Sequence, residues 1–116
     1  MRNFKELEIW KIGFEIALES YRLTREFPDE EKFGLISQMR RASVSIPSNI
    51  AEGCGRSSDK DFTRFLGVSM GSSFELETQT LIANELDFIP TTSLKDYLEL
   101  LDKFQRKTNA FMNAIR

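Results

Sequence analysis

The sequence contains no histidine and only one cysteine, Cys54, among its 116 residues. Without histidine, Ser-His-Asp and Cys-His nucleophilic sites and the Glu-x-x-His ligands of di-iron bundles are excluded. One cysteine cannot form a disulfide within the chain or a thiolate zinc site. The phosphate-binding patterns G-x-x-x-x-G-K-[ST] and G-x-G-x-x-G are also absent. We therefore expect a protein that is not an enzyme, with no catalytic residue, no metal and no cofactor.

Long apolar runs are missing as well. No segment approaches the length of a membrane span, and the first residues do not resemble a signal peptide, so we expect a cytoplasmic protein without membrane contact. The formal net charge of −2 gives no overall attraction to nucleic acid. Hydrophobic residues make up 41% of the chain and charged residues 29%, an ordinary globular balance. The length predicts one domain over residues 1–116.

Three breaks divide the chain into helical ranges: Pro28, the Gly/Ser-rich segment 53–59, and Pro90. Between them, apolar residues recur at steps of three and four over roughly 4–27, 32–53, 58–88 and 93–115. This pattern predicts an all-α fold, an up-and-down antiparallel four-helix bundle. Pro47 lies inside the second range and predicts a kink near that position.

The first helical range is apolar on two nearly opposite sides, although a four-helix bundle has only one core. One interpretation is that the helix lies deep in its own bundle or that loops cover the second face. We favour a subunit interface, because a monomer of this size rarely exposes such a stripe. One stripe comprises Leu7, Trp10, Phe14, Leu18 and Tyr21, and the predicted oligomer interface is the other, comprising Ile9, Ile12, Ile16, Leu23 and Phe27.

Three further features have both a structural and a functional interpretation. Gly67 and Gly71 lie one turn apart within a helix and predict close helix packing, or alternatively a ligand site. The outer face of the second helix carries Gln38, Arg41, Ser45, Ser48, Asn49 and Glu52, which is either a solvated face or a contact surface. Basic side chains are ordinary solvated charges or phosphate contacts, and the candidates for nucleic-acid binding are Arg40, Arg41, Arg56, Lys60, Arg64, Lys103, Arg106 and Lys107.

Two sequence blocks resemble a known family. Residues 45–56, Ser-Ile-Pro-Ser-Asn-Ile-Ala-Glu-Gly-Cys-Gly-Arg, are similar to its S-I-P-x-N-I-A-E-G-x-G-R signature, and residues 71–79 are similar to its second block. This is the four-helix-bundle family of proteins encoded in bacterial large-subunit rRNA intervening sequences, with relatives of the accessory variability protein of diversity-generating retroelements. Where the family often has a basic residue before the second block, this chain has Met70. The family-motif residues expected to be structural are Ser45, Pro47, Asn49, Glu52, Gly53, Gly55, Gly71, Ser72 and Glu75.

The resemblance implies a four-helix bundle. For the retroelement accessory protein it also implies a pentamer with a basic surface that binds RNA or DNA and a partner reverse transcriptase. We therefore expect a non-enzymatic homo-oligomeric scaffold that binds nucleic acid or a nucleoprotein partner. The alternative is a protein–protein adaptor without nucleic-acid affinity.

Overall fold

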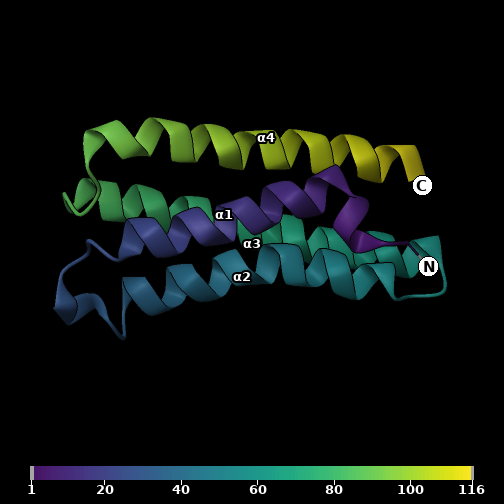
Figure 1. Ribbon diagram of the computed structural model, residues 1–116, viewed down its shortest axis with the longest axis horizontal. Helices are drawn as coiled ribbons and strands as arrows, with labels where there is room; N and C mark the ends of the chain where they lie inside the picture. The colour runs from purple at the N-terminus through teal and green to yellow at the C-terminus, as the bar shows by residue number, and fades with distance from the viewer. Residues whose placement is uncertain (1, 116) are drawn as a thin grey trace.

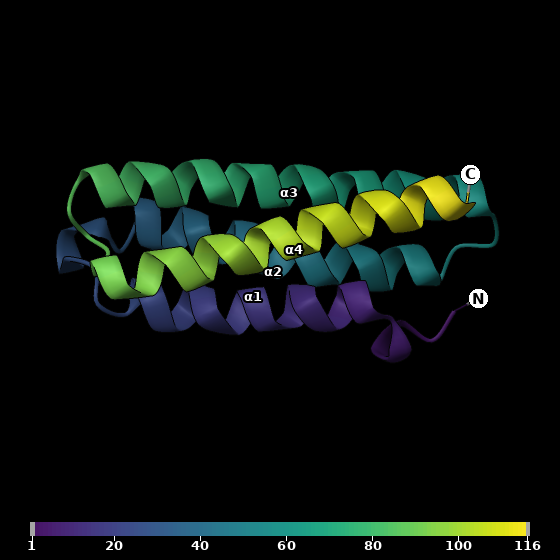
Figure 2. The same ribbon diagram turned by 90° about the horizontal axis from the view of Figure 1, so that it is seen from above.

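A computed structural model describes residues 2–115 of the chain. It contains four long helices, α1 (Glu8–Thr24), α2 (Leu35–Cys54), α3 (Asp59–Glu85) and α4 (Thr91–Ile115), with single 3-10 turns η1 (Phe4–Glu6) and η2 (Asp29–Glu31). The helices run alternately up and down and pack side by side (Figures 1 and 2). The predicted four-helix bundle is therefore confirmed, with helix limits within four residues of the expected ones.

The starts of α2 and α3 are set by local side-chain hydrogen bonds, and α2 ends at a glycine. At the start of α2, the backbone N–H of Leu35 donates to Glu31 Oε1 at 3.1 Å. At the start of α3, the Ser58 hydroxyl accepts from the Asp61 N–H at 3.1 Å, which is the capping bond that a serine at this position predicts. Gly55 follows α2 as its C-cap. α2 is a single helix across Pro47, and the kink expected there stays a prediction.

The predicted oligomer interface on α1 is wrong. The structure places that whole stripe in the subunit's own core, where each residue is at most 9% exposed: Ile9, Ile12, Ile16, Leu23 and Phe27. The leftover stripe is the opposite one, in which Phe14 is 46%, Leu18 40% and Tyr21 41% exposed. The spacing of apolar residues on α1 correctly predicts two stripes. The compact isoleucines fill the core, whereas the side chains with a polar atom on a ring, Trp10 and Tyr21, keep contact with solvent.

The glycines that allow close helix packing are not the ones predicted. A Cβ on Gly53 would lie 2.8 Å from Phe65 Cβ and 2.9 Å from Phe62 Cδ1, so α2 and α3 meet here at backbone distance. A Cβ on Gly67 or Gly71 would meet no other side chain or helix of the described residues within 4 Å, and both glycines are exposed. The expectation that Gly71 packs against a helix of the same subunit is therefore wrong.

Small hydroxyl residues form a buried polar layer within the core. Ser20 and Thr80 are fully buried, and their hydroxyls donate to backbone carbonyls one turn earlier in their own helices, at 2.7 Å in each case. The Tyr97 hydroxyl of α4 forms a short hydrogen bond with Ser20. Burial raises the pKa of Tyr97 to about 12. The hydrogen bond between Ser20 and Tyr97 thus links α1 to α4, and both of these buried hydroxyls have a partner.

We predict opposite effects for the same substitution at two glycines. Gly53→Ala should destabilise the fold by about 1–3 kcal/mol, because the new methyl group meets the Phe65 Cβ, which cannot rotate away. Within a single subunit, Gly71→Ala should instead stabilise α3 by about 0.5–1 kcal/mol, since the new methyl group meets no atom of the same subunit within 4 Å and alanine is the better helix former. Urea unfolding of both variants, at a protein concentration low enough to dissociate an oligomer, measures the difference, and equal midpoints would contradict the structure at these positions.

We also predict that stability falls as the pH rises from about 10 to about 12. In the unfolded chain Tyr97 ionises near its ordinary pKa of 10, whereas in the folded chain it keeps its proton up to about 12. Deprotonation therefore favours the unfolded state across that interval, by about 2–3 kcal/mol in total. Tyr97→Phe should reduce the slope of unfolding free energy against pH. The variant is a fair control because the Ser20 hydroxyl keeps its bond to the Ile16 carbonyl.

Candidate nucleic-acid interface

The polar residues of the first sequence block join α2 to α3. The Ser45 and Ser72 hydroxyls lie 2.8 Å apart, and the Asn49 amide donates to both the carbonyl and the hydroxyl of Ser45 at 2.8 Å. One turn along, the Ser69 hydroxyl donates to the Ile46 carbonyl at 2.7 Å. These groups satisfy one another across the helix seam, so Ser45, Asn49 and Ser72 have a structural role within the subunit.

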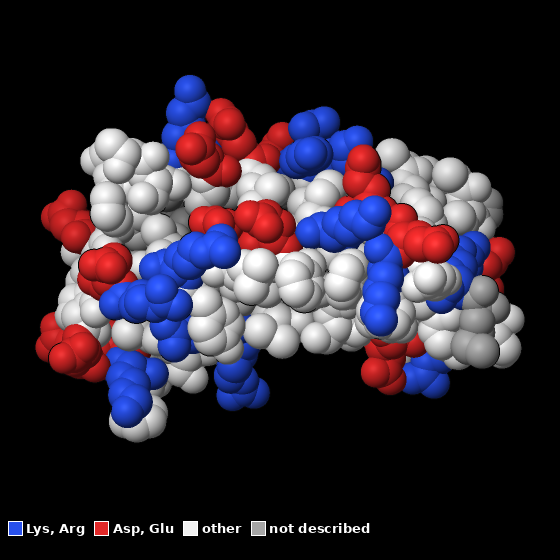
Figure 3. Space-filling view, viewed as in Figure 1, with Lys and Arg blue, Asp and Glu red and all other residues white. Residues whose placement is uncertain are grey.

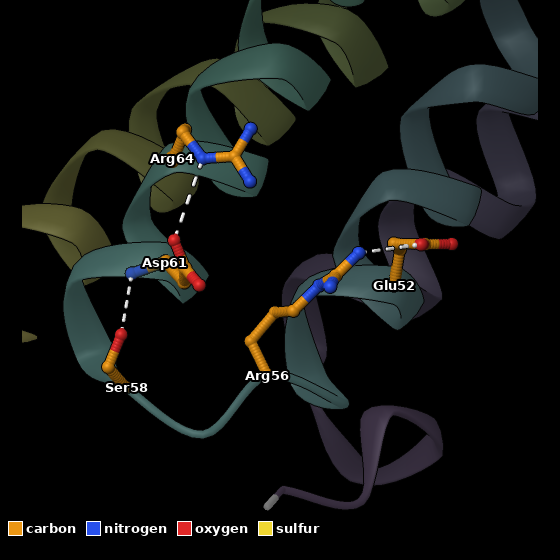
Figure 4. A network of polar contacts seen from close by, with 5 residues as sticks. All are labelled: Glu52, Arg56, Ser58, Asp61 and Arg64. Atoms are coloured by element: carbon orange, nitrogen blue, oxygen red, sulfur yellow. Dashed lines mark hydrogen bonds and ion pairs between the residues drawn. The ribbon is translucent and has the colours of Figure 1, made fainter.

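The α2–α3 connection carries the first basic group, drawn in Figure 4. The Arg56 guanidinium lies 3.0 Å from Glu52 Oε1, and that of Arg64 lies 3.7 Å from Asp61 Oδ1. Both guanidiniums also stack over the ring of Phe65, at 4.7 and 4.6 Å from its centroid. These charges are partly compensated and the two side chains are held by an aromatic ring. Lys60, which lies between Arg56 and Arg64 in the sequence, is exposed and has no ion-pair partner among residues 2–115.

The basic residues of α4 lie at the same end of the bundle. Figures 1 and 2 show both chain termini and the α2–α3 connection at this end. Arg106 lies 2.9 Å from Asp102, and Lys107 lies 2.7 Å from Glu8 of α1. The hydrogen bond and charge of Lys107 lower the pKa of Glu8. Lys103 is exposed and has no ion-pair partner within the described chain.

Arg40 and Arg41 are neighbours in sequence but differ in environment. Arg40 donates to the Thr24 hydroxyl at 2.9 Å and to the Tyr21 carbonyl at 3.5 Å, and its guanidinium lies 4.5 Å from the centre of the Tyr21 ring. It therefore links α2 to the end of α1. Arg41 is exposed, and no carboxylate of residues 2–115 lies within ion-pair distance of it. The structure does not bring this pair together with the basic groups at the other end.

Charge is unevenly divided along the bundle. The half that contains the α2–α3 connection, residues 2–14, 46–71 and 103–115, has nine basic and five acidic side chains. The other half, residues 15–45 and 72–102, has six basic and thirteen acidic ones. On the face shown in Figure 3, blue and red side chains are interspersed, and no broad area of one sign is seen. Attraction of a phosphate backbone therefore depends on the local arrangement of charges.

Two exposed features escaped the sequence reasoning. Phe33, directly before α2, is 90% exposed. The outer side of α3 exposes Phe74 (52%) and Leu81 (45%) together with Ile82 and Leu86. The signal for the second feature is present in the sequence, because Gly67, Gly71, Phe74, Thr78 and Leu81 step by four and three. Glu75 lies beside this row, with its carboxylate 3.4 Å from the Gln79 amide.

The family profile of 23S rRNA-intervening sequence proteins matches residues 5–110, almost the whole chain. The chain belongs to this family. The match covers α1, α2, α3 and α4 up to Ala110, so all the family-motif residues named above lie within the matched range.

A solved structure of similar fold comes from Bacteroides thetaiotaomicron VPI-5482 and is described as a protein of unknown function from the S23 ribosomal protein family. It superposes with a TM-score of 0.80 at 17% identity, and the alignment covers 90% of this chain and 97% of that one. At this identity the likeness concerns the fold. No curated protein sequence matches the chain.

Two negative findings concern residues 2–115 of this family member. No cluster of three or more Cys, Asp or Glu side chains is arranged to hold a metal ion in this part of the chain. No described helix is both long and apolar enough to cross a membrane.

Cys54 is buried, and burial raises the pKa of its thiol, so the protonated form prevails.

We predict different consequences for the two adjacent arginines. Arg40→Ala should destabilise the protein by about 1 kcal/mol, because it removes the hydrogen bonds and the ring contact to α1. Arg41→Ala should change stability by less than about 0.5 kcal/mol, since the side chain is exposed and unpaired within the described residues. Thermal unfolding followed by circular dichroism compares the two, and a larger loss at Arg41 would contradict the placement.

Proposed function

We propose that the protein is a non-enzymatic subunit of a homo-oligomeric scaffold that binds nucleic acid or a nucleoprotein partner. The observation that carries this proposal is the presence of two uncovered apolar faces on diagonally opposite helices of the bundle. Membership of a family named for rRNA intervening sequences supports the nucleic-acid part.

The first face lies along the outer side of α3. Gly67, Gly71, Phe74, Thr78 and Leu81 repeat at the seven-residue spacing of a helix–helix contact. Phe74, Ile82 and Leu86 are each about half exposed, although such side chains contribute roughly 1.5–3 kcal/mol each when fully buried. Two exposed glycines cost this helix about 1 kcal/mol each relative to alanine. A neighbouring subunit would account for both features.

The second face lies along α1 and complements the first in shape. Gly13 of α1 packs against Ile46 and Pro47, and Ser69 of α3 donates to the Ile46 carbonyl, so Gly13 and Ser69 lie at the same level of the bundle. Bulky side chains flank this level on α1, and glycines flank it on α3. The bulky residues are Trp10 and Phe14, and the glycines are Gly67 and Gly71.

This match favours a head-to-tail contact between copies of the chain. If subunits stand side by side with their axes aligned, the aromatic rings of one α1 face meet the flat glycine segment of the next α3 face. Such a contact repeats, and it closes into a ring when the rotation per subunit allows. A ring of five follows from the resemblance alone. The sequence prediction of an oligomer is thus retained, with a different set of interface residues.

The nucleic-acid part rests on the unpaired basic residues and on the family. Arg41, Lys60 and Lys103 are exposed without an ion-pair partner among the described residues. Repetition of these cations in an oligomer would add their fields at the phosphate backbone. Resemblance to the retroelement accessory protein points to a reverse transcriptase as a protein component. Absence of any nucleic-acid affinity would favour the adaptor function instead.

We predict that the protein is an oligomer at micromolar concentration and that Phe74→Glu combined with Leu81→Glu yields smaller particles. Both side chains are about half exposed in the subunit, so the variant should remain helical. Multi-angle light scattering gives the mass, and circular dichroism gives the helix content.

A matched control is available on α2, outside both proposed contact faces. Val44 is 42% exposed, so Val44→Glu adds a charge to an exposed apolar position and should leave the mass unchanged. A monomeric parent chain, or equal dissociation by Val44→Glu, would show that the α3 face is not the subunit contact.

A further inference from the structure

We propose that the outer face of α2, between Tyr21 and Phe33, is a groove that binds single-stranded nucleic acid. The inference rests on the proposed function, because it assigns the nucleic-acid contact of the scaffold to one surface and names the form of the ligand. The groove has a volume of about 720 Å³ and follows α2 from Ile36 to Asn49. That length corresponds to about 20 Å of helix, enough for several nucleotides.

The charge of this groove is of one sign. Its lining includes Lys32, Arg40 and Arg41 and contains no aspartate or glutamate. The acids next to its two ends are engaged elsewhere: Glu31 accepts from the Leu35 N–H, and Glu52 forms an ion pair with Arg56. By contrast, the cleft between α1 and α4 is lined by Glu15, Glu19, Glu26 and Asp96 together with one arginine. The acidic cleft would repel a phosphate backbone, whereas the α2 groove attracts it.

The aromatic residue at one end of the groove is presented to solvent by an ordered turn. Phe33 is 90% exposed, and the Lys32 ammonium lies 5.6 Å from the centre of its ring. Gly34 follows with φ −108° and ψ −116°, and its N–H donates to the Glu31 carbonyl at 3.0 Å. A Cβ on Gly34 would lie 2.8 Å from Glu31 Oε1, so a larger residue would displace the carboxylate that accepts from the Leu35 N–H. The turn keeps the Phe33 ring out of the core.

A second aromatic ring borders the groove on the α1 side. The Tyr21 ring is 41% exposed and carries the Arg40 guanidinium 4.5 Å from its centre. This arrangement places a stacking surface and a cation together, as Lys32 and Phe33 do at the groove's end. Exposed rings interspersed with cations are the pattern of proteins that bind single strands, because unpaired bases can stack while phosphates pair with the cations. Duplex bases are stacked on one another and cannot use these rings.

The first experiment compares ligands. Fluorescence anisotropy measures binding of the 116-residue chain to a single-stranded RNA, the single-stranded DNA of the same sequence and a duplex with the same number of nucleotides, with poly-glutamate added as a competitor. We expect both single strands to bind more tightly than the duplex, and poly-glutamate not to compete at equal charge. Equal competition by poly-glutamate would assign the groove to an acidic protein partner and overturn the inference. The ratio of RNA to DNA affinity shows whether the 2′-hydroxyl is read.

The second experiment separates stacking from charge. Phe33→Ala should weaken single-strand binding by roughly 5- to 100-fold, reduce the preference over duplex, and leave the salt dependence unchanged. Arg41→Ala should weaken binding to every nucleic acid and reduce the slope of log K against log salt by about 0.7. Neither exposed side chain supports the core, so the melting temperature and the particle mass should stay as in the parent. Loss of mass in Phe33→Ala would instead make Phe33 a subunit contact and overturn the inference.

Lys95→Ala is the matched control. It removes one exposed cation from α4, which lies diagonally opposite α2, and should change single-strand affinity less than Arg41→Ala does. Lys60→Ala and Lys103→Ala test the exposed cations at the other end of the bundle. If the parent protein binds single strands and only the Lys60 and Lys103 variants lose affinity, the groove is wrong while the proposed function stands. If the parent binds neither single strands nor duplex at low salt, the proposed function fails together with the groove.

Discussion

Gly13 brings α1 so close to α2 that a methyl group there would lie 3.0 Å from Ile46 Cγ2 and 3.4 Å from the Pro47 nitrogen. Proline has no N–H at this point of the helix, so the backbone of α1 can approach it without displacing a hydrogen bond. From the other side, the Ser69 hydroxyl binds the Ile46 carbonyl. These contacts join α1, α2 and α3 at one level of the bundle. They fix how far each helix is shifted along the bundle axis and how it is rotated about its own axis. The orientation of every outer face depends on this contact.

This contact also shows how far sequence reasoning reaches. Spacing of apolar residues and the breaks at Pro28 and Pro90 are local signals, and they predicted four helices and their order. The choice between two apolar stripes on α1 is not local, because either stripe could face the core. What decides it is the packing of Gly13 against Pro47, which involves residues far apart in sequence. For the same reason Gly53 and Gly71 look alike in the sequence, although only Gly53 meets aromatic side chains.

The basic residues show the same limit: the sequence lists them, but only the structure shows which of them are paired. Eight basic residues were candidates for nucleic-acid contact. Four of them lie in ion pairs: Arg56, Arg64, Arg106 and Lys107. Arg40 is held by hydrogen bonds to α1. Counting cations along the sequence could not identify these pairs, since Lys107 meets Glu8 only after folding. Exposed ion pairs contribute little to stability, but they reduce the local field that a phosphate would feel. The α2 groove differs because its lining contains cations without acids.

The two proposed surfaces are compatible because of the order of the helices around the bundle. α1 and α3 occupy opposite corners, and α2 lies between them, with extensive contacts to both. Contacts that join the α1 face of one copy to the α3 face of the next leave every α2 on the same side of the assembly. Tyr21 lies at the boundary, where the Arg40 guanidinium over its ring assigns it to the groove. Copies of the groove would then line one surface. A strand bound to one copy would be held at high effective concentration near the next, so the assembly would bind more tightly than any single groove.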